Sequence, residues 1–110
     1  MPHIRMYGMS QSVVAQLSNT LVDKLTDICQ AKAESFIIDW MSNQSYRRGQ
    51  SVNNIAQIEV LWFPKDPETH HRAEKAIREA VTNAYPELKH TIIMFRELVP
   101  SNYYKDGQHF

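Results

Sequence analysis

Residues 1–8 read Met-Pro-His-Ile-Arg-Met-Tyr-Gly, and this stretch decides how the rest of the chain is interpreted. Apolar residues alternate with His, Arg and Tyr from position 2 to position 7, and a period of two is typical of a β-strand. Gly8 interrupts the alternation, as glycine does at the end of a strand. We therefore predict a first strand over residues 2–7.

The apolar residues that follow have a helical period. They recur at steps of three and four, at Val14, Leu17, Leu21, Leu25 and Ile28. This spacing predicts an amphipathic helix that runs to about Lys32, with Ser10 or Ser12 as its N-cap. A β-branched and aromatic run over residues 35–42 then predicts a strand that is buried on most of both faces.

The second half of the chain has the same order of elements. Residues 43–54 are polar and lack apolar periodicity, which indicates an exposed connection between paired strands. Residues 55–63 predict a strand, and Asp66-Pro67 predicts the start of a helix that ends before Pro86. Residues 90–98 predict a fourth strand, and a polar tail with tyrosines runs from Pro100 to the last residue.

The order is therefore strand, helix, strand, twice, within a single domain of residues 1–110. Split β-α-β folds of the α+β class have this order, with a four-stranded mixed sheet and two helices on one face. The second face of such a sheet is normally wet, yet the strand sequences offer it little polar alternation. Both helices are already used, so we expect other copies of the chain to cover this face in a closed homo-oligomer.

The composition argues against several classes of function for this protein. Twelve Lys and Arg balance twelve Asp and Glu, so the formal net charge is zero and no net field attracts nucleic acid or a membrane surface. The one cysteine, Cys29, has no intrachain partner for a disulfide, and we expect it to be a buried, inert thiol. With no export pattern at the start, a reducing cytoplasm is the expected location.

The dipeptide Met1-Pro2 is the most informative chemical feature. An initiator methionine before proline is commonly removed, which leaves Pro2 as a free secondary amine. An α-amino group titrates near pH ~8, and burial beside cations lowers its pKa toward neutrality, where a general base works best. The alternative is a proline that merely begins an edge strand.

Three segments carry a family resemblance: Met1-Pro2-His3-Ile4-Arg5, residues 59–63 (Glu-Val-Leu-Trp-Phe), and residues 102–110 (Asn-Tyr-Tyr-Lys-Asp-Gly-Gln-His-Phe). Together with the doubled β-α-β order, they resemble the tautomerase superfamily that includes macrophage migration inhibitory factor (MIF). Within it, the chain most resembles an uncharacterised bacterial domain family (DUF1904-like). A weaker resemblance, through the Pro-His start and residues 97–100, is to the 5-carboxymethyl-2-hydroxymuconate isomerases.

This resemblance implies a homotrimer with a pocket at each subunit interface around the N-terminal proline. Pro2 would move a proton between carbon and oxygen of a small enol or 2-keto acid, without metal or organic cofactor. Lys32 has the position of a pocket lysine in the MIF branch and is the first candidate for the cationic role. Weaker candidates for substrate binding are Arg47, Arg48, Tyr103 and Tyr104.

Two departures from the family pattern leave a second interpretation open. The small tautomerases place an arginine where this chain has Ser10-Gln11-Ser12, and the fourth strand lacks the tyrosine and asparagine of the MIF pocket. The alternative is a non-catalytic trimeric module that binds a small ligand or a protein. A generic ferredoxin-like domain is the third interpretation.

The second predicted helix carries the remaining candidates. Glu74 with Arg78, and Lys75 with Glu79, have the i,i+4 spacing of ion pairs on a solvated face. His70 and His71 with Glu74 could in principle hold a metal, but two ligands without a credible third favour surface histidines.

Overall fold

The computed structural model describes residues 2–110, so the prediction that Met1 is removed lies outside the described residues. The main elements are two long helices and a set of strands and short 3-10 turns. In chain order they are β1 (His3–Tyr7), α1 (Gln11–Cys29), η1 (Ala33–Ser35), β2 (Ile37–Met41), β3 (Ser45–Arg47), β4 (Gln50–Val52), β5 (Ile55–Trp62), α2 (Pro67–Ala84), β6 (His90–Glu97), η2 (Pro100–Asn102), β7 (Tyr104–Lys105) and β8 (Gln108–His109).

Both helices begin where the sequence predicts. The Ser10 hydroxyl accepts a hydrogen bond from the Val13 amide at 3.3 Å, and the Asp66 carboxylate accepts one from the Thr69 amide at 2.8 Å. Each side chain thereby satisfies one of the amide groups that a helix start leaves without a partner. Pro67 occupies the first turn of α2, where its missing N–H costs nothing.

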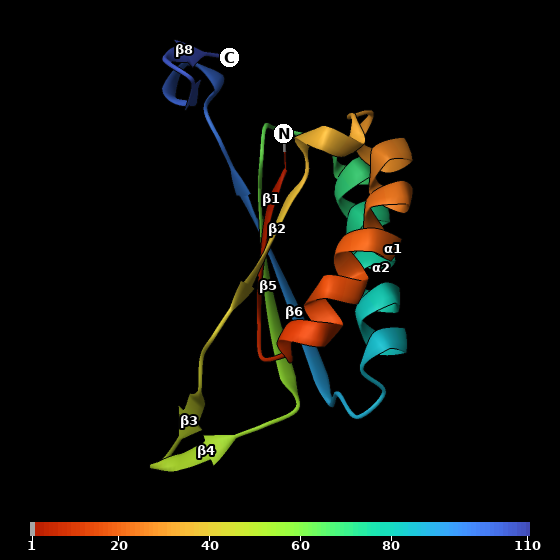
Figure 1. Cartoon of the computed structure of the whole chain (residues 1–110), viewed down its shortest axis with the longest axis vertical. Coiled ribbons are helices and arrows are strands. Elements are labelled where there is room, and N and C mark those ends of the chain that lie inside the picture. Colours follow the sequence, from red (N-terminus) through yellow and green to blue (C-terminus); the bar gives the residue numbers. More distant parts are fainter. Residues whose placement is uncertain (1) are drawn as a thin grey trace.

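The predicted four-stranded mixed sheet is confirmed. Its strand order is β2-β1-β5-β6, with β1 parallel to β2, antiparallel to β5, and β5 parallel to β6. Helices α1 and α2 lie together on one face, and the other face carries no helix (Figure 1). Each helix thus connects two parallel neighbouring strands, which is the doubled β-α-β arrangement.

The connection over residues 43–54 differs from the prediction in one respect. Strands β2 and β5 do not pair with each other, because β1 lies between them. The connecting residues instead form their own antiparallel hairpin, β3–β4, which projects away from the helices beyond one end of the sheet (Figure 1).

The core lies between the sheet and the two helices. From the strands it takes Ile4, Met6, Ala56, Ile58, Val60 and Trp62, and from the helices chiefly Val14, Leu17, Leu21, Leu25, Ala73, Ile77 and Val81. All of these residues are at most 3% exposed. Removal of this apolar surface from water is the main stabilising contribution to the fold.

The prediction that the strand over residues 35–42 is buried on most of both faces is wrong for the single chain. Strand β2 lies at a sheet edge, and its residues are exposed or half-buried. Ile37 is 43% exposed and Trp40 is 40% exposed. An apolar run is compatible with a central strand or an edge strand, and the insertion of β1 beside β5 makes this one an edge.

The helix-free face of the sheet, called the open face below, is more polar than predicted. A row of alternating charge crosses it: Asp39 of β2 neighbours Arg5 of β1, Arg5 neighbours Glu59 of β5, and the Arg96 guanidinium lies 3.3 Å from Glu59. The Tyr7 hydroxyl also donates to Glu59 at 3.2 Å. Three apolar residues of this face, Ile37, Ile92 and Met94, are each about two fifths exposed.

The tail folds back on itself after β6. Strands β7 and β8 pair as a small hairpin, and the Phe110 amide donates to the backbone carbonyls of Pro100 and Tyr103. No helix within residues 2–110 has the length and apolar character needed to cross a lipid bilayer.

Candidate functional site

Pro2 lies at the entrance to the central strand β1. Its ring is less than 2% exposed, and its carbonyl accepts a hydrogen bond from the Ile37 amide at 3.1 Å. The antiparallel register pairs His3 with Leu61, and the next step of that register places Pro2 opposite Trp62. Pro2 therefore belongs to the helix-facing layer of the sheet.

His3, on the open face, contacts the C-terminal tail of its own chain. Its Nε2 atom lies 2.6 Å from the Tyr103 hydroxyl. The Tyr103 ring packs edge-on against Phe63 and Phe110, with ring centroids 5.5 and 5.0 Å apart. Burial, aided by the nearby Arg5 guanidinium, lowers the pKa of His3 below its usual value. An aromatic cluster thus joins the tail to the residue after Pro2.

The sequence did not indicate the contact between His3 and Tyr103. The two residues are one hundred positions apart. The only available clue was the placement of a histidine directly after the candidate base.

Two lysines, Lys32 and Lys65, lie near the end of the sheet where β1 begins. The sequence analysis proposed only Lys32 as a site residue. Lys32 is exposed and is the N-cap residue of η1, the short turn between α1 and β2. Lys65 is half-buried, and its ammonium group lies 3.5 Å from the Cys29 carbonyl oxygen at the end of α1. Sequence reasoning missed Lys65 because it lies in an aperiodic connection between Pro64 and Asp66.

The remaining candidate residues lie apart from Pro2 in the single chain. Arg47 and Arg48 belong to the β3–β4 hairpin, at the opposite end of the molecule from the start of β1 (Figure 1). Tyr104 is 64% exposed, and its ring packs against His109 within the terminal hairpin. Only a neighbouring copy could bring the two arginines to a site at Pro2.

The expectation that Cys29 is buried is confirmed. Cys29 is 4% exposed at the end of α1. Burial raises the pKa of the thiol, and the nearby Lys65 ammonium only partly opposes this effect. Because the thiolate is the nucleophilic form, these surroundings favour an unreactive side chain.

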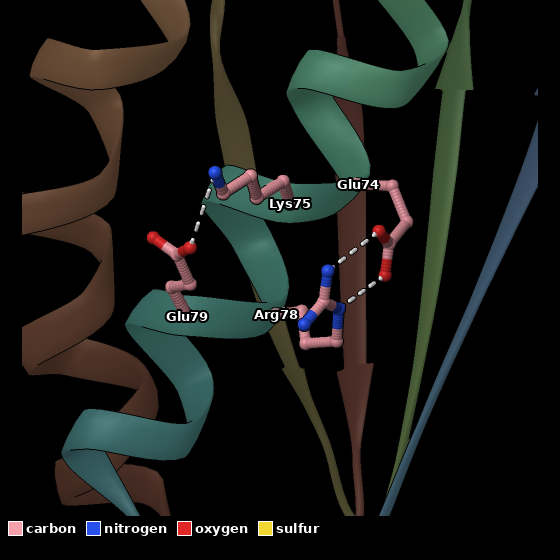
Figure 2. Close-up of polar contacts among 4 residues, drawn as sticks. All are labelled: Glu74, Lys75, Arg78 and Glu79. Atoms are coloured by element: carbon pink, nitrogen blue, oxygen red, sulfur yellow. Dashed lines mark hydrogen bonds and ion pairs between the residues drawn. The ribbon is translucent and has the colours of Figure 1, made fainter.

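Helix α2 shows the predicted ion pairs on its outer face. The Arg78 guanidinium donates to both Glu74 carboxylate oxygens, at 2.8 and 3.3 Å, and the Lys75 ammonium lies 3.9 Å from Glu79 (Figure 2).

The histidines of α2 were expected at the surface, but His70 is half-buried. Its ring packs against the rings of Trp62 and Phe95, with centroids 5.0 and 4.9 Å apart. Within residues 2–110, no three or more His, Cys, Asp or Glu side chains are grouped so that they could hold a metal ion.

Comparison with known proteins establishes the family. Residues 1–109 match the family described as "Domain of unknown function (DUF1904)". The chain belongs to this family. No curated protein sequence matches the chain. The structure of a DUF1904 domain from Sebaldella termitidis is similar over 100% of both chains, with a TM-score of 0.91 and 29% sequence identity.

More distant matches show the wider fold class. A structure described as "F6 fused 4-OT wild type asymmetric trimer" has a TM-score of 0.82 and 15% identity, over 97% of this chain and 94% of the other. A macrophage migration inhibitory factor-like protein from Entamoeba histolytica has a TM-score of 0.79 and 11% identity, over 99% and 98%. This DUF1904 chain therefore has the α+β tautomerase fold that its sequence resembles.

Proposed function

We propose that this DUF1904 chain is a tautomerase-like isomerase that acts on a small enol or 2-keto acid. After removal of Met1, the Pro2 nitrogen is the general base that takes a proton from oxygen or carbon. The same nitrogen, then protonated, returns the proton as general acid to the other atom. The reaction moves one proton and needs no redox partner.

The position of Pro2 is the observation that carries this proposal. Burial of a secondary amine at the entrance to the central strand, in a layer that excludes water, favours its neutral and basic form. The hydrogen bond from the Ile37 amide to the Pro2 carbonyl fixes the backbone, so the nitrogen has a defined direction. The fold shared with 4-OT and a MIF-like protein supports the same assignment.

The proposed working unit is a homotrimer. The fused 4-OT match is described as a trimer, and the open face here leaves Ile37, Ile92 and Met94 partly exposed. In a trimer, the proposed pocket at Pro2 lies between copies. Lys32 is then the proposed cation for the substrate carboxylate, Arg47 and Arg48 approach from a neighbouring copy, and Tyr103 and Tyr104 close the pocket.

The first test compares three proteins: the processed chain, the Pro2→Ala variant, and a chain with an N-terminal extension that keeps the Pro2 nitrogen as an amide. Mass spectrometry first verifies that Met1 is removed. Phenylenolpyruvate and 2-hydroxymuconate are then assayed for ketonisation. We expect activity in the processed chain alone, with a loss of at least about a hundredfold in the other two. Equal rates in all three would contradict the proposal.

Assembly is tested separately by light scattering at micromolar concentration. We expect a mass of three chains. A monomer would contradict the interface pocket while leaving the fold assignment intact.

The burial of Pro2 favours a second candidate function. A base that is less than 2% exposed must become accessible before a substrate can reach it. The second candidate is a non-catalytic trimeric module that binds a small ligand or a protein on the same scaffold. If the processed chain forms a trimer but has no tautomerase activity, the binding function is favoured over the catalytic one.

A further inference from the structure

An open cavity lies beside the start of α2, on the helix-facing side of β6. Its volume is about 470 Å³. The residues that line it are Lys65, Pro67, His70, His71, Glu74 and Phe95. The proposed proton transfer at Pro2 does not use this cavity. Three of the lining residues, His70, His71 and Glu74, are the ones that the sequence analysis weighed as metal ligands and set aside.

One side of the cavity is suited to an anion. Lys65 lines the cavity and supplies a positive charge. Among residues 2–110, one of its three N–H donors is directed to a protein atom, the Cys29 carbonyl oxygen, which lies outside the lining. His70 and His71 add ring nitrogens that can donate hydrogen bonds.

The only acid among the lining residues does not oppose this charge. Both carboxylate oxygens of Glu74 accept hydrogen bonds from the Arg78 guanidinium, as Figure 2 shows. The bidentate pair holds the Glu74 carboxylate toward Arg78 and offsets its charge. With Glu74 held by Arg78, Lys65 is the charged lining residue that remains for a ligand.

The other side of the cavity is aromatic and apolar. The Phe95 and His70 rings lie 4.9 Å apart, and both pack on Trp62 behind them, at 4.8 and 5.0 Å between centroids. Such a wall favours a flat, unsaturated body over a compact hydrated ion.

We propose that this cavity binds a small aromatic or unsaturated carboxylic acid, with the carboxylate at Lys65 and the planar body against Phe95 and His70. The proposal does not depend on catalysis at Pro2, and it goes beyond that function. Trp62 separates Pro2 from the cavity: it is opposite Pro2 in the strand register, and its ring stacks on Phe95, which lines the cavity.

The Trp62 indole N–H is a built-in reporter of occupancy. It is buried and has no hydrogen-bond partner among residues 2–110. Trp40 is the matched reference, because its indole donates to the Met9 carbonyl at 3.0 Å and it lies on the far edge strand, β2. The indole resonances of the two tryptophans are distinguished with the Trp40→Phe variant.

The experiment is an NMR titration of the intact chain with benzoate, its neutral analogue benzamide, and inorganic phosphate, each to about 10 mM. We expect benzoate to shift the Trp62 indole resonance and to leave that of Trp40 in place. Lys65→Met should weaken the benzoate affinity about tenfold or more, because a charge-assisted hydrogen bond is lost. His70→Phe, which keeps the ring packing but removes the nitrogens, should weaken it severalfold.

Arg72→Met is the matched control, because Arg72 is an exposed cation on the same helix outside the lining. We expect it to bind benzoate as the unmodified chain does. No shift of Trp62 with benzoate, an equal shift with benzamide or phosphate, or an unchanged affinity in Lys65→Met would overturn the proposal. The titration measures binding alone, so its outcome is independent of whether the chain catalyses tautomerisation.

Discussion

The two faces of strand β5 have different surroundings although they belong to the same eight residues. Toward the helices, Ala56, Ile58, Val60 and Trp62 are at most 1% exposed. Toward the open face, the alternate residues of the same strand are only half-buried, and they include Glu59 with its charged neighbours. The difference shows that the helices of the single chain fully cover one face of the sheet. The open face is left to solvent or to a partner.

Substitution of one leucine from each side is the strongest way to test this difference. Leu21 of α1 is fully buried, whereas Leu61 of β5 is half-buried on the open face. We expect Leu21→Ala to lower the free energy of unfolding by about 3 kcal/mol at any protein concentration. We expect Leu61→Ala to lower it by about 1 kcal/mol where the chain is a monomer, and by more at the higher concentrations where the proposed trimer covers the open face. Urea denaturation at several protein concentrations measures both. A loss at Leu61 as large as that at Leu21 would show that the open face is covered in solution.

Gly8, where the chain turns from β1 toward α1, gives the next largest expected effect. Its φ is +87°, and a Cβ atom there would meet the Ile55 carbonyl oxygen. Gly49 in the hairpin has a similar φ of +83° but open space around it. We therefore expect Gly8→Ala to cost about 3 kcal/mol and Gly49→Ala about 1 kcal/mol in urea denaturation. Equal costs would mean that the close approach of β5 does not matter.

The helix layer also depends on its caps. Ser10→Ala removes the side-chain acceptor for the Val13 amide, and we expect it to lower the free energy of unfolding by about 1 kcal/mol. Ser18→Ala on the outer face of the same helix is the control, with an expected change of less than about 0.5 kcal/mol. An effect at Ser18 as large as that at Ser10 would argue against a capping role.

The smallest expected effect is a pH dependence from the open face. The pKa of His3 is lowered in the folded chain, chiefly by burial, so folding favours the neutral ring. This contribution is present above the unfolded pKa of about 6.5 and is lost as the pH falls through the folded pKa. Urea midpoints at about pH 7.5 and pH 5 should differ less in His3→Gln than in the unmodified chain. An identical pH dependence in both proteins would exclude His3 as the source.

Local chemistry made much of the fold predictable. Asp66-Pro67 predicts the start of α2 because the cap and the first turn depend only on adjacent residues. The alternation over residues 2–7 likewise predicts β1. The edge position of β2 was not predictable in this way, because it depends on β1 pairing with β5, more than forty positions later in the chain.

The candidate site was predictable only in part, for the same reason. Pro2 stands out because its chemistry is unusual in itself. Lys65 and the contact between His3 and Tyr103 have no local pattern, and only the folded chain brings them to one end of the sheet. The two arginines of the hairpin are exposed and adjacent, which made them conspicuous in the sequence although the fold holds them far from Pro2.

The return of the tail to the start of the chain has a practical consequence for protein engineering. The start of β1 and the carboxyl end lie at the same end of the molecule (Figure 1), and Phe110 packs on Tyr103, which contacts His3. An affinity tag or fluorescent fusion at either terminus would therefore crowd the same corner, and one at the start would also cap the Pro2 nitrogen. The exposed Arg48-Gly49 turn of the hairpin is the better place to insert a label.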